Sequence, residues 1–368
     1  MSSKNKFGLL EAVCITSTLM ITKNFYTSLS FIVKTVGTSA WIMTLVSCIT
    51  SILAFLVIYM LMKRFPGKDL IEIFELVTGK IIGKLLAIVL CAYFLYYTGI
   101  NLREFLEMIK AYNLPYTPPS IILGVVVVSA IIFSFIGIEG IARVSYLCFF
   151  PVLAGTAAII IMAIPEYNPR GILPIFGMGV EKTLITGALR SSVYSEVIIL
   201  TVIIKSIHGI KTFKRAGLIS LIITGTTFIL SCLSYVMAFD YTSGSENLSG
   251  LFQLSRIIYY NRFFQRVEPI FLFTWSAASV MLVVIGFYIS IIIYSKTLRI
   301  KDYKPLIFPF SFLLFMVSII PENLSEVVYV HILVIRQYGL IVTYALPVFI
   351  FLLALVLRKK GAHRNEET

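Results

Sequence analysis

Two long apolar stretches of this 368-residue chain each carry a cation near the middle. Lys23 interrupts the stretch 7–31, and Arg190 interrupts the stretch 180–204. A charge at the centre of a bilayer costs at least about 2.5–3.5 kcal/mol, so such side chains usually face a cavity or a partner inside the protein. We therefore expect both cations to lie where the protein binds something, and a carboxylate-bearing ligand would suit two neighbouring positive charges.

Side chains that can form hydrogen bonds surround both cations. Small or polar residues of this kind would let a membrane helix break near the midplane and turn its free backbone groups towards a ligand. The predicted ligand-binding residues are Thr22, Lys23, Asn24, Tyr26, Gly187, Arg190, Ser191 and Tyr194.

Structural roles compete with this prediction for the two cations. Arg190 could instead pair with Glu104, Glu107 or Glu181, the first two of which follow the last turns of a predicted span. The Lys23 side chain could snorkel, with its methylene stem covering apolar surface.

Three further charged residues are expected to have gating or structural roles. Glu196 stands close to the inner end of its span, either as a gate or as an interface residue. Arg266 and Glu268 stand at the outer mouth of a later span, where an ion-pair anchor is the favoured role.

The composition predicts an integral membrane protein. Hydrophobic residues make up 58% of the chain and charged residues 13%, with a mean hydropathy of +0.94. Soluble domains carry about 25% charged residues, and a helix needs about 20 apolar residues to cross a bilayer. We expect one transmembrane domain over residues 1–368, with spans at about 7–31, 41–62, 84–105, 120–138, 143–164, 180–204, 215–238, 269–295, 304–321 and 337–357.

The charge distribution sets the expected orientation. The net charge is +13, and Lys and Arg gather before the first span, after the even-numbered spans and in the C-terminal tail. This asymmetry is typical of cytoplasmic segments, so both termini are expected in the cytoplasm. The same clusters are topology anchors, and they do not indicate a nucleic-acid partner. The first span lacks a cleavage pattern and is expected to be retained.

Ten spans divide into two halves of five, which an odd count forces into opposite orientations. The predicted fold is therefore an all-α 5+5 inverted repeat of the LeuT and APC type, with spans 1 and 6 broken. In the long loop 240–268, residues 251–260 have the pattern of an amphipathic helix at the outer interface, and a lid over an outer cavity is the alternative.

The residue types argue against an enzyme. The five cysteines lie inside apolar spans, the three histidines are scattered, and no nucleophile–base pair or glycine-rich nucleotide motif is present. We therefore expect no metal ion and no cofactor.

Several loop and span motifs resemble one family. They are Asn113-Leu114-Pro115-Tyr116-Thr117-Pro118, Gly137-Ile138-Glu139-Gly140-Ile141-Ala142-Arg143, Asn168-Pro169 with Leu173-Pro174-Ile175-Phe176-Gly177, Ser195-Glu196, and the segment from Gln265 to Trp275. With them, the whole chain resembles the endospore germination permeases, the B subunits of nutrient germinant receptors, which are related to amino acid–polyamine–organocation transporters.

The resemblance implies a receptor subunit that senses a small nutrient, usually an amino acid, in the inner membrane of a spore. It also implies assembly with a membrane-embedded A subunit and a lipoprotein C subunit. One departure is that Thr22-Lys23-Asn24 and Leu29 stand where relatives usually carry small residues and a proline. The alternative function is a proton- or sodium-coupled amino acid transporter, because fold alone does not separate the two.

Overall fold

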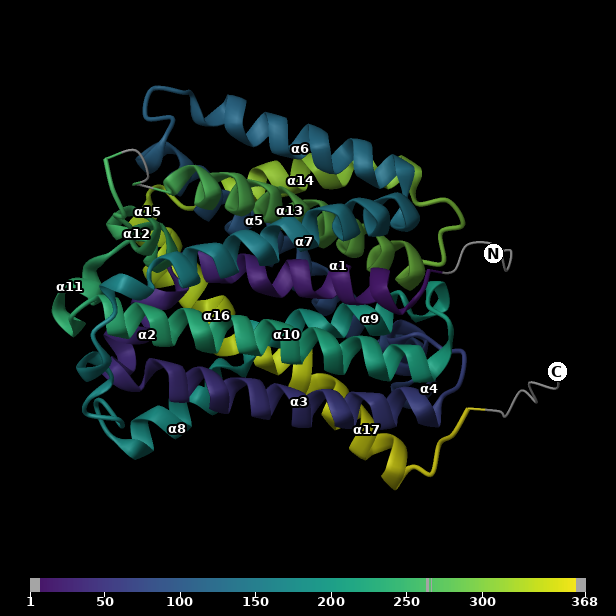
Figure 1. Ribbon diagram of the computed structural model, residues 1–368. Helices are drawn as coiled ribbons and strands as arrows, with labels where there is room; N and C mark the ends of the chain where they lie inside the picture. The colour runs from purple at the N-terminus through teal and green to yellow at the C-terminus, as the bar shows by residue number, and fades with distance from the viewer. Residues whose placement is uncertain (1–6, 263–264, 266, 362–368) are drawn as a thin grey trace.

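The computed structural model describes residues 7–262, 265 and 267–361, and these residues fold into an all-α bundle without a β-strand (Figure 1). Within them, eight helical stretches are long and apolar enough to cross a membrane. They are Ser28–Arg64, Lys80–Tyr112, Pro119–Ile136, Ile138–Met162, Val180–Val202, Gly209–Ala238, Glu268–Thr297 and Leu324–Val356. The predicted span at 304–321 corresponds to a shorter apolar helix, Lys304–Ser318.

The first predicted span is not one continuous α-helix. Helix α1 (Leu9–Ile21) is followed by a 3-10 segment, η1 (Thr22–Phe25), an extended residue at Tyr26, and helix α2 (Ser28–Val36). The irregular backbone begins at Thr22, whose hydroxyl bonds back to the Thr18 carbonyl at 2.6 Å. Such bonds compete with the regular helix, as expected for clustered polar residues.

The sixth predicted span changes its backbone at the corresponding cation. Helix α8 (Val180–Leu189) ends at Arg190, and a 3-10 segment η5 (Arg190–Ile198) leads into the short helix α9 (Ile199–Val202). A 3-10 stretch of this length is unusual and often marks a functional hinge. Both cations therefore lie in non-α backbone.

Two helices extend well beyond the predicted spans. Helix α5 (Lys80–Tyr112) begins before the predicted span 84–105 and continues past it, so that both Glu104 and Glu107 lie inside the helix. The last stretch begins at Leu324, and its helix α16 (Leu333–Leu340) carries Arg336 between two π-helical segments, η8 (Val327–Ile332) and η9 (Ile341–Ala345).

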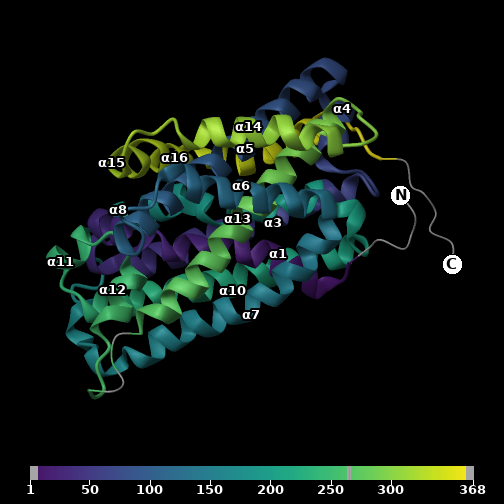
Figure 2. The same ribbon diagram turned by 90° about the horizontal axis from the view of Figure 1, so that it is seen from above.

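The broken helix lies in the interior of the bundle. Helix α1 packs on α7 (Ile138–Met162), α10 (Gly209–Ala238), α13 (Glu268–Thr297) and η5. Seen from above, α7 and α14 (Ile307–Ser318) lie on opposite flanks with α13 between them (Figure 2). The outward faces of peripheral helices such as α6 (Pro119–Ile136) carry exposed Ile, Val and Phe side chains, as a lipid-facing surface requires.

The remaining helices complete the connections between these elements. Helix α3 (Ala40–Arg64) follows α2 after Gly37, whose φ of +71° suits glycine and separates the two helices. The others are α4 (Leu70–Thr78), α11 (Tyr241–Glu246), α12 (Gly250–Ile257), α15 (Leu324–Glu326) and α17 (Leu346–Val356).

Ion pairs hold the helices together at one end of the bundle. It is the end at which α4, α9 and α17 finish, on the right of Figure 1. Asp69, which caps α4, is 1% exposed and accepts Lys296 at 2.9 Å and Lys205 at 3.4 Å. Lys296 also donates to the Val202 carbonyl at 2.6 Å. These bonds tie α4, α13 and the end of α9 together.

The opposite end is covered by the segment that contains α11 and α12. The predicted amphipathic helix is present as α12, and its Leu251 and Leu254 side chains are buried against the bundle. Ser249, at the start of α12, donates from its hydroxyl to the Phe25 carbonyl at 2.7 Å. The outer segment is thus bonded directly to the break in the first span.

Candidate functional site

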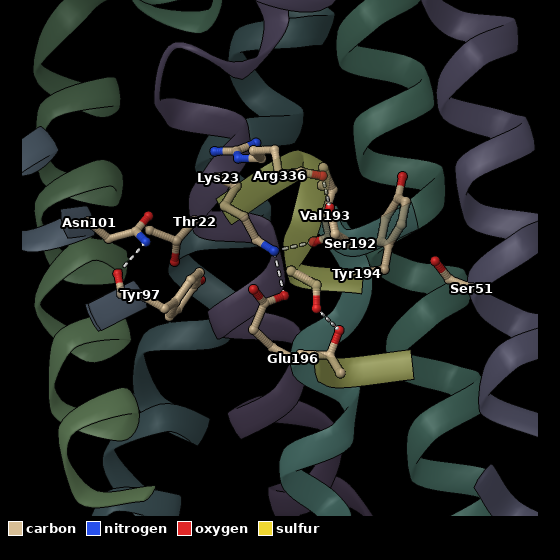
Figure 3. Close-up of polar contacts among 12 residues, drawn as sticks. Thr22, Lys23, Ser51, Tyr97, Asn101, Ser192, Val193, Tyr194, Glu196 and Arg336 are labelled. Atoms are coloured by element: carbon tan, nitrogen blue, oxygen red, sulfur yellow. Dashed lines mark hydrogen bonds and ion pairs between the residues drawn. The ribbon is translucent and has the colours of Figure 1, made fainter. Parts of the chain in front are cut away.

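Lys23 and Glu196 form a buried ion pair at the centre of the bundle. Lys23 is 1% exposed and Glu196 is 3% exposed. The Lys23 ammonium group donates to the Glu196 carboxylate and to the Val193 carbonyl, so that η1 is joined to η5 (Figure 3). It also lies 5.9 Å from the centre of the Tyr97 ring. The carboxylate partner of Lys23 is thus supplied by the chain itself.

This pair defines the environment of two residues whose surroundings the sequence left open. Lys23 does not snorkel to an interface, because its side chain is buried in the bundle. Glu196 is buried beside the break in the first span, although the sequence places it close to the inner end of its predicted span.

Arg190 has a different environment from Lys23. Its guanidinium group lies over the Phe31 ring, 4.2 Å from the centroid, and the residue is 8% exposed. Within the described ranges it forms no ion pair with a carboxylate. The three acids predicted as its alternative partners, Glu104, Glu107 and Glu181, do not pair with it.

Glu104 and Glu107 bind other groups. Glu104 is fully buried, and its Oε1 accepts from the Thr27 hydroxyl at 2.7 Å and from the Thr27 amide at 3.3 Å. Glu107 pairs with Arg103 at 2.8 Å, and Glu181 is exposed at the start of α8. Neither glutamate is therefore an ion-pair partner of Arg190 in the described part of the chain.

Arg336 is a buried cation that the sequence analysis missed. It is 4% exposed on α16, its Nη1 donates to the Ser28 hydroxyl at 2.5 Å, and its carbonyl accepts from the Ser192 hydroxyl. Its Nη2 is buried without a hydrogen-bond partner in the described structure. The sequence does carry an indication of this buried position. Mostly apolar residues stand on both sides of Arg336, at 327–335 and 339–357, so the charge interrupts one long apolar stretch.

Two connected cavities lead to the arginines. A vestibule of about 430 Å³ beside α11 is lined by α2, α11 and α15, including Ser30, Lys34 and Ser325. A cavity of about 10 Å³ lies further in, between Arg190 and Arg336. The two share Thr27, Phe31 and Val328 in their linings, so the small cavity continues the vestibule inwards.

Most of the other predicted ligand-binding residues point into helix contacts. Gly187 faces α3, where an added Cβ would meet the Met43 carbonyl at 2.9 Å, and the Ser191 carbonyl accepts from Ser51 at 3.0 Å. Tyr194 packs on Phe228 of α10 and, in Figure 3, turns away from Lys23.

The polar residues of the first span are similarly engaged in the bundle. The Asn24 amide donates to Ser231 at 2.6 Å, Thr22 bonds to the Thr18 and Ala278 carbonyls, and the Tyr26 ring packs edge-on against Trp275. The polar side chains that line the inner cavity are instead Thr27, Ser28, Arg190 and Arg336.

Of the predicted outer anchors, Glu268 begins α13 and forms an ion pair with Arg256 at 3.7 Å, which links α12 to α13. Arg266 lies outside the described residues. Among those residues, no group of His, Cys, Asp and Glu is arranged to hold a metal ion.

The site can therefore bind a small polar ligand that enters from the end of the bundle covered by α11 and α12. The inner part of the site is lined by the polar turn at Thr27 and Ser28 and by two cations, Arg190 and Arg336. Charged groups in such a dry environment interact strongly with an opposite charge.

Comparison with known proteins places the chain among spore germination proteins. The spore germination protein family model matches residues 9–327. The chain is 22% identical to spore germination protein KB of Bacillus subtilis (strain 168) over 336 residues, 90% of either chain. It is also 22% identical to spore germination protein B2 of the same organism over 373 aligned residues, 98% of either chain. Since the family match covers most of its length, the chain belongs to the spore germination permease family.

Proposed function

We propose that this protein is the transporter-like membrane subunit of a nutrient germinant receptor. In this proposal it binds a small nutrient, an amino acid, in the vestibule and signals germination together with A and C subunits. The observation that carries the proposal is the vestibule of about 430 Å³, whose lining continues inwards to Arg190, at the break of the sixth predicted span, and to Arg336 of α16. Family membership supports the germination role.

The proposed topology has ten spans in a 5+5 inverted repeat, with both termini in the cytoplasm of the spore and the vestibule facing outwards. The matching positions of the two irregular segments, η1 and η5, support this arrangement. The side of the bundle closed by Asp69 is then the cytoplasmic side, and the basic clusters of the sequence agree with it.

The proposal is tested by filling the vestibule. Ser325 is exposed and lines it, so Ser325→Trp adds bulk there without disturbing buried packing. In spores of the host, we expect the amino acid concentration for half-maximal germination to rise at least about tenfold, as for a loss of about 1.4 kcal/mol in binding. Ser243→Trp, at an exposed serine of α11 outside the vestibule lining, is the matched control.

A second measurement separates the receptor from the transporter. The chain alone is placed in proteoliposomes, and uptake of labelled amino acids is measured with and without proton and sodium gradients. Binding without uptake supports the receptor subunit. Gradient-driven uptake by the chain alone contradicts it and assigns a secondary transporter. Co-purification with A and C subunits tests the partners.

A further inference from the structure

Two buried guanidinium groups face one small cavity without a carboxylate to neutralise them. Arg190 and Arg336 are 8% and 4% exposed and line the same cavity of about 10 Å³. Arg190 contacts the Phe31 ring, and Arg336 contacts only the neutral hydroxyl of Ser28 through Nη1. Neither forms an ion pair in the part of the chain that the structure describes.

The two neighbouring buried glutamates do not neutralise both arginines. Glu196 is engaged by Lys23, and Glu104 is held by Thr27 beyond ion-pair distance of either arginine. Even if Glu104 offsets one guanidinium through space, the other positive charge is left uncompensated. Buried charges in proteins are normally paired, because removing an ion from water costs several kcal/mol. The imbalance therefore points to an anion that is supplied from outside the chain.

The donors available are those that fit a carboxylate. The Nη2 of Arg336 is buried without a partner, and a guanidinium group presents parallel N–H donors that match the two oxygens of a carboxylate. The cavity also connects to the vestibule through Thr27, Phe31 and Val328. A small anion at this cavity would thus meet an unsatisfied donor beside the vestibule.

We propose that Arg190 and Arg336 form an anion seat that binds the carboxylate of the ligand and so determines specificity for carboxylates. The proposal rests on the proposed function only in taking this carboxylate to be that of a nutrient amino acid. Lys23, the other buried cation of this region, is excluded from the seat because Glu196 already binds it. Helix α16 thereby contributes to recognition, together with the two interrupted stretches.

The seat is tested with matched carboxylates and amides. The full chain is purified in detergent, and its thermal unfolding midpoint is titrated with acetate and acetamide, and with alanine and alaninamide. We expect the carboxylates to raise the midpoint and the amides to leave it unchanged. Arg336→Gln and Arg190→Gln should each weaken carboxylate binding about tenfold or more, since hydrogen bonds to charged groups are strong. Arg170→Gln, at an exposed arginine of the outer loop, is the matched control.

The outcomes separate the seat from the nutrient assignment. Stabilisation by acetate but by no amino acid supports the seat and contradicts amino acid recognition. Stabilisation by alanine and alaninamide alike, unchanged in both glutamine variants, overturns the seat and leaves the proposed function standing. No stabilisation by any carboxylate overturns the seat. If Arg336→Gln does not fold, Arg336→Lys replaces it: unaltered carboxylate binding in Arg336→Lys and Arg190→Gln also overturns the seat.

Discussion

The two interrupted stretches hold their cations in opposite ways. Lys23, in the first, has a carboxylate and a carbonyl from η5 as permanent partners. Arg190, in the sixth, lies on an aromatic ring and beside a cavity that it shares with Arg336. The difference indicates two roles. The Lys23–Glu196 pair fixes the two irregular segments to each other, whereas the two arginines remain available to bind a ligand.

The largest expected change in the free energy of unfolding comes from breaking the Lys23–Glu196 ion pair. Glu196→Gln leaves the Lys23 charge buried without a counter-charge, which costs about 3–5 kcal/mol in the free energy of unfolding. We expect this loss in an SDS titration in mixed micelles. Glu181→Gln, at an exposed acid of the same apolar stretch, should change the free energy of unfolding little. Equal effects of the two variants would show that the pair does not fix the segments.

Removing both members of the pair should be milder than removing one. In Lys23→Met with Glu196→Gln, no unpaired charge is left in the interior, and buried ion pairs are often replaceable by neutral groups. We expect at least about 2 kcal/mol of the stability lost in Glu196→Gln to return, measured as the coupling energy of a double-mutant cycle. A double variant as unstable as the sum of the singles contradicts the direct pairing.

Breaking the ion pairs of Asp69 should have an intermediate effect on stability, because the two lysines that pair with it are partly exposed to solvent. The side chains of Lys205 and Lys296 are 41% and 29% exposed, so solvent screens them more than Lys23. Asp69→Asn keeps the helix cap but loses the charge, and we expect a smaller destabilisation of about 1–2 kcal/mol. Asp302→Asn, at an exposed acid before the 3-10 turn Lys304–Leu306, is the control. A loss as large as that of Glu196→Gln contradicts the role assigned to screening.

The smallest change in the free energy of unfolding is expected at Arg190, which has no carboxylate partner in the described structure. Phe31→Leu removes the ring under Arg190 and keeps an apolar side chain, so the free energy of unfolding should fall by about 1 kcal/mol. Phe312→Leu, at a ring that is 61% exposed on α14, is the control. If Phe31→Leu is as harmful as Glu196→Gln, Arg190 depends on its ring as fully as Lys23 depends on Glu196.

Hydropathy and residue type predicted the all-α membrane class and the places where the first and sixth stretches leave regular helix. They could not predict the partner of Lys23, because pairing depends on how deeply η5 packs against η1 and on which face Glu196 lies. Arg336 was missed for a simpler reason. The predicted last span begins at residue 337, directly after this charge, whereas the helix continues through Arg336 because the interior and a small cavity accommodate it. Glu104 was named only as a possible partner of Arg190, and its hydrogen bonds with Thr27 depend on tertiary packing.

The bond between Ser249 and the Phe25 carbonyl has a mechanical consequence. Ser249 begins a helix whose other end is anchored to α13 through Arg256 and Glu268. A displacement of this outer helix therefore pulls on the backbone of η1, next to the lysine that holds η5. Helix α12, η1 and η5 are thus joined in series by the Ser249 hydrogen bond and the Lys23–Glu196 ion pair.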